Sequence, residues 1–337
     1  MGSRQRVFSG IQPSGEIHVG NYLGAIKNWA AMLDEYECIF CIVDYHAATI
    51  EYDPRAMPQR IFDAALANIA CGLDPNRCTL FVQSAVPEHT ELCWALMSVC
   101  PMGELGRMTQ FKQKSDQHKD NVNAGLWAYP VLQAADILLY KATKVPVGED
   151  QLQHLELCRE IGRRFDARFG EVFAEAHAML SPAPRVMGLD GKAKMSKSLG
   201  NHLGVLEPPD EVRRKLRPAY TDPQRLRRSD PGRPELCNIF TMHKGFSPPD
   251  VVERVDRDCR TAAVGCMDCK MLLADHIDRV LGPARERAAE LRADPQRVWD
   301  ALDSGAAHCR AIARETMREV RKAMGLRGDD TGPARRT

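Results

Sequence analysis

The stretch "RVFSGIQPSGEIHVGNYLGA", residues 6–25, decides how the chain begins to fold. Its first six residues read as a short strand that breaks into a turn of Gly, Pro and Ser. Residues 17–36 then have the three-and-four apolar spacing of a helix. Gly10 and Gly20 lack a Cβ, so backbone or a flat base can approach them closely. His18 can donate to a phosphate at the helix start, although a tight turn with an incidental histidine is an equal alternative on spacing alone.

The following segments alternate between strand and helix patterns. Residues 38–49, "CIFCIVDYHAAT", form a continuous apolar run typical of a buried parallel strand. Residues 54–71 indicate a helix and residues 78–84, "CTLFVQS", another strand. This alternation predicts an α/β fold with a doubly wound parallel sheet of Rossmann type.

Strand signals fade after about residue 200, which predicts a change of domain. We expect a catalytic domain over residues 1–200 and a smaller all-α domain over 201–296, with an irregular Pro-rich piece at 218–234. Residues 297–337 form a C-terminal helix and tail that could pack on either domain.

Composition limits the class of protein. The 337 residues carry a net charge of +1, with 44% apolar and 27% charged residues, which is typical of a soluble globular protein. No apolar run has membrane-spanning length and no signal peptide opens the chain, so a cytoplasmic location is expected. Most of the twelve cysteines are therefore interpreted as core residues rather than a disulfide framework. Basic stretches at 213–233 and 310–336 suit either a phosphate backbone or a solvated face, and charge alone does not decide.

The segment "DGKAKMSKSLGN", residues 190–201, is a Gly-flanked loop with two lysines three positions apart. The ammonium groups of Lys194 and Lys197 can close over a triphosphate and stabilise the charge that develops during transfer. A solvated Lys/Ser loop is the alternative for this spacing taken alone.

The segment "YPVLQAADILLY", residues 129–140, places three polar side chains on one helical face, at Tyr129, Gln133 and Asp136. Asp136 could simply cap or bridge inside the domain. However, a buried carboxylate needs a hydrogen-bond donor as its partner, and a substrate N–H would supply one.

Four cysteines downstream have the spacing of a metal site: Cys237, Cys259, Cys266 and Cys269. The polar, turn-like context "GCMDCK" is a poor place for cysteines that serve only as apolar residues, so a tetrahedral thiolate site is expected. One CxxC pair with two separated cysteines favours a 4Fe–4S cubane, and zinc is the second candidate.

Together, "HVGN" and "KMSKS" resemble the paired signature of class I aminoacyl-tRNA synthetases. The segments "FCIVDYHA", "GELGRMTQFKQKS", "YPVLQAADILLY" and "VPVGEDQLQHLEL" occur in the order found in bacterial tryptophanyl-tRNA synthetases. The resemblance covers nearly the whole chain. The four cysteines and "RRSDPGRPELC" are similar to the subset of that family with a 4Fe–4S cluster near the anticodon-reading surface.

The resemblance implies activation of L-tryptophan by ATP to tryptophanyl-adenylate, with release of pyrophosphate, and transfer of tryptophan to the terminal ribose of tRNA(Trp). It also implies Mg²⁺ as a cofactor and a homodimer. The implied catalytic residues are His18, Lys114, Lys194 and Lys197. The implied ATP-binding residues are Gln12, Pro13, Ser14, Gly20, Asn21, Gly148, Glu149, Asp150, Val186, Lys194, Met195, Ser196, Lys197 and Ser198. The expected tryptophan-binding residues are Phe8, Gly10, Gln12, His46, Tyr129, Gln133, Asp136, Val145, Val147 and Gln151.

One departure from the pattern of the tryptophan enzymes leaves tyrosine as an alternative substrate. The Tyr/Gln/Asp spacing also occurs in tyrosyl-tRNA synthetases, and many bacterial tryptophan enzymes have Met where this chain has Gln133. Phe8 stands where the tyrosine enzymes place a Tyr that bonds the substrate hydroxyl, which favours tryptophan. A synthetase-like nucleotide- or RNA-binding regulator without aminoacylation is a further alternative.

Overall fold

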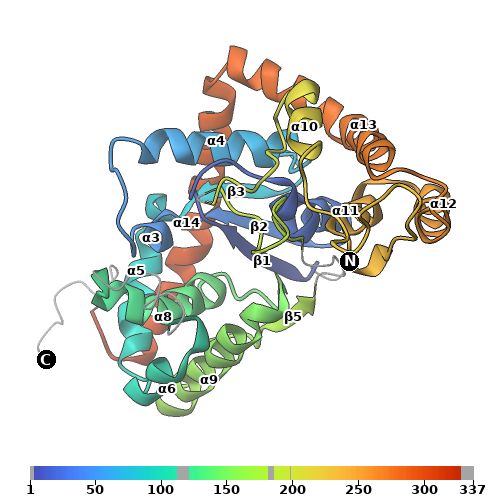
Figure 1. Cartoon of the computed structure of the whole chain (residues 1–337). Coiled ribbons are helices and arrows are strands. Elements are labelled where there is room, and N and C mark those ends of the chain that lie inside the picture. The colour runs from blue at the N-terminus through green and yellow to red at the C-terminus, as the bar shows by residue number, and fades with distance from the viewer. Residues whose placement is uncertain (1–3, 112–120, 181–185, 198, 328–337) are drawn as a thin grey trace, which may run out of the picture.

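A five-stranded parallel sheet in the order β3-β2-β1-β4-β5 forms the centre of the molecule (Figure 1). The computed structural model describes residues 4–111, 121–180, 186–197 and 199–327. The strands are β1 (Arg6–Ile11), β2 (Glu37–Ile42), β3 (Thr79–Val82), β4 (Lys144–Val147) and β5 (His177–Leu180). The parallel α/β fold expected from the alternating pattern is confirmed.

The helices cover both faces of this sheet and extend beyond it. They are α1 (Val19–Asn21), a π-helical turn (Tyr22–Ile26), α2 (Lys27–Met32), α3 (Asp44–Ala47), α4 (Met57–Ala70), α5 (Glu88–Met97), α6 (Met102–Arg107), α8 (Ala124–Leu138), α9 (Leu152–Phe169), α10 (Pro209–Leu216), α11 (Asn238–Phe246), α12 (Pro249–Arg260), α13 (Cys266–Ala293) and α14 (Gln296–Ala323). Short 3₁₀ turns lie at Gln83–Ala85, Glu149–Gln151 and Pro234–Leu236. None of the helices among the described residues has both the length and the apolar character needed to cross a membrane.

Two expected elements are shorter in the structure. The strand predicted over 38–49 ends at Ile42, and Asp44–Ala47 form a helical turn, because Asp44 accepts hydrogen bonds from the backbone amides of Tyr45 and Ser84. The helix predicted over 17–36 begins only after His18. Ile17 is instead paired with Val205 through backbone hydrogen bonding.

The alternation of side chains along each strand builds two apolar cores, one on each face. Val7 faces the core made with α2, α4, α10, α11 and α13, whereas Phe8 faces the core made with α5, α8, α9 and the second half of α14. α10, α11 and α13 therefore share a core with the sheet, whereas Val251 and Val255 of α12 form a small separate cluster with Phe240. The domain boundary expected near residue 200 stays a prediction.

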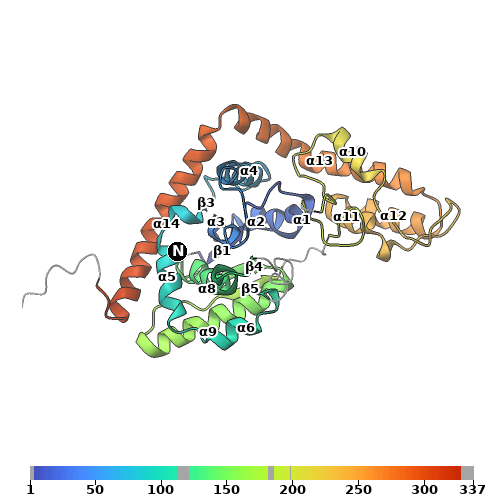
Figure 2. The ribbon, with the colours of Figure 1, turned by 60° about the vertical axis from the view of Figure 1, so that its left-hand side comes forward.

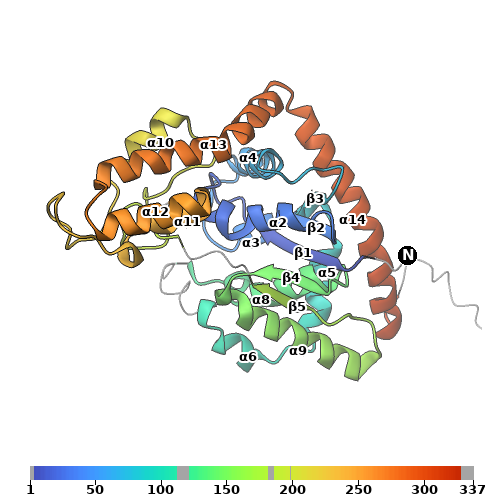
Figure 3. The ribbon, with the colours of Figure 1, turned by 90° about the vertical axis from the view of Figure 1, so that its right-hand side faces the viewer.

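The last helix packs on the sheet rather than on α10–α12 (Figures 2 and 3). α14 covers the edge of β3 and passes from one core to the other, with Leu302 in the first and Cys309 in the second. Gly305 allows the close approach, because a Cβ at this position would lie 2.1 Å from the carbonyl oxygen of Leu80. This contact shields a strand edge that would otherwise expose unpaired backbone groups.

Candidate active site

The carboxyl ends of the parallel strands gather the candidate residues at one edge of the sheet. Gln12 follows β1, α3 follows β2, Gln83 follows β3 and Gly148 follows β4. The strand order reverses between β1 and β4, and ligands of open α/β sheets bind in the crevice at such a point.

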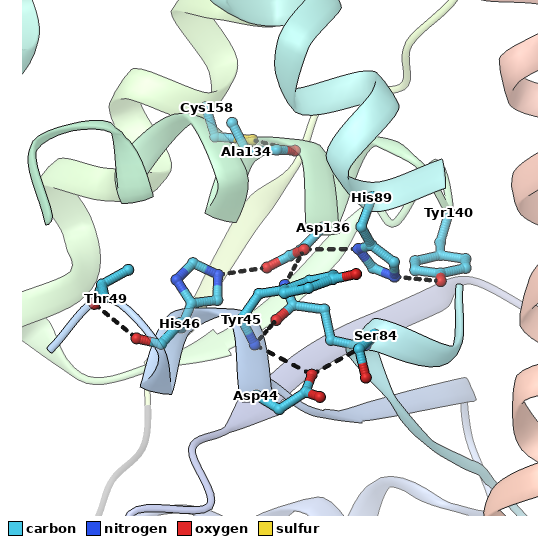
Figure 4. A network of polar contacts seen from close by, with 11 residues as sticks. Asp44, Tyr45, His46, Thr49, Ser84, His89, Ala134, Asp136, Tyr140 and Cys158 are labelled. Carbon is cyan, nitrogen blue, oxygen red and sulfur yellow. Dashed lines mark hydrogen bonds and ion pairs between the residues drawn. The ribbon is translucent and has the colours of Figure 1, made fainter. Parts of the chain in front are cut away.

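Asp136 of α8 is the centre of a buried hydrogen-bond network at this edge (Figure 4). Its carboxylate is 2% exposed. Oδ1 accepts from Nε2 of Gln83 at 2.7 Å and from Nδ1 of His89 at 2.7 Å. Oδ2 accepts from Nε2 of His46 at 2.8 Å. Three donors from three different elements therefore hold one carboxylate in place.

This network keeps Asp136 ionised. Burial alone would raise the pKa of the carboxyl, but the hydrogen bonds from His46 and His89 outweigh burial and hold that pKa well below its usual range. An ionised carboxylate only accepts, so Nδ1 of His89 carries the proton and its Nε2 accepts from the Tyr140 hydroxyl at 2.7 Å. Burial strongly raises the pKa of Tyr140, so Tyr140 remains a phenol that can donate.

One premise of the sequence argument does not hold. We expected the buried Asp136 carboxylate to need a substrate N–H as its partner, but protein donors already engage both oxygens. A carboxylate oxygen can accept two hydrogen bonds, and from the described residues Oδ2 receives one, from His46. Contact between Asp136 and an indole therefore stays a prediction, with Oδ2 as the available oxygen.

Apolar residues line the same face of the sheet. Phe8 is buried and stacks on Tyr140, with ring centroids 5.4 Å apart and an interplanar angle of 14°. Val145 is buried in the same core, and Val147 is half-buried beside it. The predicted apolar slot thus has its members on one face, and its role as a substrate slot stays a prediction.

The remaining predicted tryptophan-site residues lie around this network. Tyr129 is buried and its hydroxyl lies 2.8 Å from Nε2 of His154, with the His46 ring edge-on at 6.2 Å between centroids. Gln133 is half-buried one turn before Asp136 on α8. Gly10 is exposed near the end of β1, and Gln12 and Gln151 are half-buried just beyond strand ends.

The two signature segments meet in space. Gly15 has a φ of 137°, and a Cβ on it would lie 2.7 Å from Cδ of Lys197, so the Lys197 side chain lies directly over this turn. A Cβ on Gly20 would lie 3.8 Å from Cβ of Met195. The turn before α1 and the loop with Lys194 and Lys197 therefore form the two sides of one site.

His18 caps helix α1 and is poised as a donor. Its Nδ1 accepts from the backbone N–H of Asn21 at 3.3 Å, and its own backbone N–H donates to Oδ1 of Asn21 at 3.1 Å. Burial, with His202 and Lys194 nearby, lowers the pKa of His18 to about 4. The ring is therefore neutral at pH 7, and with Nδ1 accepting, Nε2 carries the proton. A neutral N–H donor suits a phosphate oxygen.

The lysine loop is a closed hairpin. Met187 and Lys194 form an antiparallel bridge, and the Gly188 N–H donates to the Ala193 carbonyl at 2.8 Å. Asn201 fastens the loop by accepting from the Ser196 N–H at 2.8 Å. Val186 and Met195 are buried, while Lys194, at the bridge, and Lys197, three residues beyond it, are exposed.

The other predicted ATP residues fall into three groups. Pro13 and Ser14 lie in the turn under Lys197. Gly148, Glu149 and Asp150 are exposed at the end of β4, and a Cβ on Gly148 would lie 2.7 Å from Oδ1 of Asp150. Lys114 and Ser198 lie outside the described residues.

The four predicted metal-binding cysteines converge between α11, α12 and α13. Burial, with the other three thiols nearby, raises the pKa of Cys269 to about 12. Polar groups surround the sulfur atoms: Nη1 of Arg225 lies 3.7 Å from Sγ of Cys259, and Nε2 of His243 lies 3.5 Å from Sγ of Cys269. A Cβ on Gly232 would lie 2.5 Å from Sγ of Cys259, so a glycine makes room for this sulfur.

Sequence reasoning missed three members of the Asp136 network: Gln83, His89 and Tyr140. Gln83 carried a usable signal, because it is the first polar residue after a buried strand that ends at the ligand-binding edge. Tyr140 lies four residues after Asp136 in a helical segment. His89 carried no sequence signal of its role, because it lies 47 positions away from Asp136 in the sequence.

A parallel sheet whose first turn carries His18, and whose lysine loop closes over that turn, defines a class I aminoacyl-tRNA synthetase. A model of the family described as tRNA synthetases class I (W and Y) matches residues 2–282, and the chain belongs to this family.

Relatives of known name resemble the chain over nearly its whole length. It is 54% identical over 326 residues to the tryptophan–tRNA ligase of Deinococcus radiodurans, covering 95% of this chain and 98% of the relative. It is 42% identical over 326 residues to the tryptophan–tRNA ligase of Thermotoga maritima, and the match covers 95% of this chain and 99% of that relative. The crystal structure of Campylobacter jejuni tryptophanyl-tRNA synthetase complexed with ADP and tryptophan superposes with a TM-score of 0.84 at 35% identity, covering 96% of this chain and 100% of that chain.

Proposed function

We propose that this chain is a tryptophan–tRNA ligase, which activates L-tryptophan with ATP and transfers it to tRNA(Trp). The observation that carries the proposal is the meeting of the His18 turn and the Lys194–Lys197 loop, in a chain 54% identical to a relative named for this activity. ATP and Mg²⁺ fit a class I synthetase.

The reaction requires positioning and charge stabilisation rather than a protein nucleophile. The tryptophan carboxylate attacks the α-phosphate of ATP, and pyrophosphate leaves from the opposite side. Lys194 and Lys197 stabilise the charge on the departing pyrophosphate, and the neutral His18 donates through Nε2. Mg²⁺, when bound, neutralises phosphate charge. Gly148–Asp150 would face the ribose and Val186 the adenine.

The apolar face formed by Phe8, Val145 and Val147 would hold the indole, and Oδ2 of Asp136 would accept its N–H. Gln12, Tyr129, Gln133 and Gln151 would surround the amino-acid end. The alternative, a tyrosine-specific enzyme, is less well supported, because Phe8 has no hydroxyl to bond a substrate phenol and stacks instead on Tyr140. The other alternative, a regulator that does not aminoacylate tRNA, is also less well supported, because it does not explain why the lysine loop lies over the His18 turn.

Pyrophosphate exchange into ATP, measured with each amino acid in the absence of tRNA, tests the proposal. We expect exchange with tryptophan at a catalytic efficiency at least 10³-fold above that with tyrosine. Exchange with tyrosine alone would establish the alternative substrate, and exchange with neither would support the regulator.

We also propose that Cys237, Cys259, Cys266 and Cys269 hold a 4Fe–4S cluster. The sequence pattern of one CxxC pair with two separated cysteines favours the cluster over zinc. The other three thiols lie near the buried Cys269, so the four sulfurs belong to one group. The nearby Arg225 and His243 suit its anionic sulfurs. The cluster would order α11–α13.

Iron and sulfide analysis of anaerobically purified protein tests this assignment. Four iron and four sulfide per chain, with brown colour, are expected, and Cys259→Ser should lose the iron. The half-buried Cys100→Ser, in the other half of the molecule, should keep it. Stoichiometric zinc without iron would make zinc the resident metal.

A homodimer is the proposed assembly. Trp94 of α5 and Met102 of α6 are 76% and 74% exposed, which is unusual for large apolar side chains. Burial against a second copy would remove this surface from water. Analytical ultracentrifugation should show a dimer that Trp94→Glu weakens, and a monomeric wild type would contradict the proposal. The domain boundary near residue 200 and the cytoplasmic location stay predictions.

A further inference from the structure

Three titratable side chains meet on the flank of the His18 turn, apart from the residues assigned above. Glu16 comes from the turn before α1, whereas His202 and Glu207 follow the lysine loop. One ligand atom from each of the three lies within 4.8 Å of the others, and Nε2 of His202 lies 3.5 Å from a carboxylate oxygen of Glu16. Both residues are buried, with 9% of the Glu207 side chain and 11% of the His202 side chain exposed.

Two polar atoms in this cluster have no hydrogen-bond partner in the part of the chain that the structure describes. They are Nδ1 of His202 and Oε2 of Glu207. Leaving such atoms buried and unsatisfied costs about 1–3 kcal/mol each. Few buried polar groups in folded proteins lack a partner, so each of these two atoms points to a missing ligand.

The charges around the cluster indicate what kind of ligand is missing. Glu16 and Glu207 bring two carboxylates to this cluster against the one ammonium of Lys215, so negative charge is in excess. Lys215 donates to Oε1 of Glu207 and to the backbone carbonyl of His202. It therefore provides a partner for Oε1 of Glu207 but not for Oε2. A cation would supply both the charge and the missing partner.

The backbone makes room for this arrangement. A Cβ on Gly204 would lie 2.1 Å from Oε1 of Glu16, so only glycine lets the Glu16 carboxylate reach the cluster. Val19 donates to the Leu203 carbonyl at 2.8 Å, and Val205 to the Ile17 carbonyl at 2.9 Å. These bonds hold the two segments, and with them the three side chains, side by side.

We propose that Glu16, His202 and Glu207 bind one divalent cation of the manganese–zinc group. An imidazole nitrogen with two carboxylate oxygens is a ligand set for these metals, whereas Ca²⁺ and Mg²⁺ sites use oxygen ligands. The cation cross-links the turn before His18 to the segment after Lys197. Metal binding here does not depend on the proposed function and requires neither nucleotide nor amino acid.

Electron paramagnetic resonance of free Mn²⁺, titrated against the full-length protein without nucleotide, tests the proposal. Mn²⁺ is the probe because the thiolates of the four-cysteine site prefer softer metals. We expect one bound Mn²⁺ per chain, and at least a 10-fold loss of affinity in Glu207→Gln. Glu211→Gln is the matched control, because Glu211 pairs with Arg214 outside the cluster, and its affinity should equal that of the wild type.

Glu16→Gln provides a second variant, since Glu16 is only half-buried and its replacement should leave the fold intact. It should lose Mn²⁺ affinity in the same way. Absence of bound Mn²⁺ in the wild type, or retention of binding by both Gln variants, would overturn the proposal.

Discussion

At the scale of single residues, Asp136 is an ion that the protein stabilises before any substrate arrives. Gln83, His46 and His89 converge on it from three different elements. A carboxylate held in this way is rigid, and rigidity is useful for an acceptor that must meet one N–H in one direction. The same arrangement makes the carboxylate a contributor to stability.

Asp136→Asn should lower the free energy of unfolding by about 3–5 kcal/mol at pH 7, because it leaves buried donors opposed to an amide. The pKa of Asp136 is depressed in the folded state, so its contribution is fully present above the unfolded pKa of about 3.9 and is lost as the pH falls below it. Urea unfolding from pH 6 to pH 3 should therefore show a shallower loss of stability in the variant.

Asp34→Asn is the control for this prediction. Asp34 is 91% exposed in an ion pair with Arg77, and its loss should change stability by less than about 1 kcal/mol. Equal acid slopes in wild type and Asp136→Asn would contradict the prediction.

Lys197→Ala should lower the rate of tryptophan activation by about 10²–10³-fold, the usual cost of removing one group that stabilises developing charge. Tryptophan affinity should hardly change, because Lys197 lies over the Gly15 turn rather than beside Asp136. Pyrophosphate exchange and tryptophan binding by calorimetry separate the two effects. Lys192→Ala, in the same loop and also exposed, should behave like the wild type. A large loss of tryptophan binding in Lys197→Ala would contradict the assigned role.

Local spacing was sufficient to place Tyr129, Gln133 and Asp136 on one helix, since all three belong to one periodic segment. Spacing could not reveal which donors meet Asp136. Gln83 and His89 lie 53 and 47 positions away, and their meeting depends on how β3 and α5 pack against α8. Long-range polar contacts of this kind require the tertiary structure.

At the scale of elements, α14 packs along the edge strand β3 and covers that edge of the sheet. Gly305→Ala should destabilise the protein by about 1–3 kcal/mol, because the new Cβ would lie 2.1 Å from a Leu80 backbone atom and force the helix outward. Gly106→Ala is the matched control in α6, where Gly106 is exposed and no neighbouring atom lies within 4 Å of the added Cβ. It should stabilise the protein by about 0.5–1 kcal/mol, since alanine is the better helix former. Thermal unfolding of the two variants measures the contrast, and equal effects would show that the Gly305 contact is unimportant.

The apolar pattern predicted where strands lie better than where they end. β1 spans the residues of "RVFSGI", and β3 lies inside "CTLFVQS", because their apolar runs are bounded by turn residues. The run at 38–49 continues into "DYHA" without a break in hydropathy. The chain turns there, where Asp44 accepts hydrogen bonds from the Tyr45 and Ser84 amides.

At the scale of the whole molecule, α13 joins the cysteine region to the sheet. It spans 28 residues, or about 42 Å at 1.5 Å per residue, and packs along α4, α10 and α11. α14 then returns along β3 and places Cys309 against Tyr140, which bonds His89 of the Asp136 network. The helices that would carry the RNA-binding surface are thus in continuous contact with the candidate active site.

The basic stretch at 213–233 is not a uniform surface, and this decides which arginines can meet RNA. Arg233 forms a forked contact with the buried Asp222, and Arg225 bonds the Val264 carbonyl and the Cys259 sulfur. Arg217 and Arg227 are exposed and have no ion-pair partner among the described residues. These two are the better candidates for phosphate contacts.

The double variant Arg217→Gln/Arg227→Gln should therefore weaken tRNA(Trp) binding and leave tryptophan-dependent exchange unchanged. Each phosphate contact contributes about 0.7–0.9 to the slope of log affinity against log salt, so loss of two contacts should lower the magnitude of the slope by about 1.4–1.8. Filter binding at several salt concentrations measures it. Arg163→Gln/Arg164→Gln removes the same charge from α9, where both arginines are paired with glutamates, and should leave the slope unaltered. If both double variants change the slope equally, general charge rather than this surface attracts the tRNA.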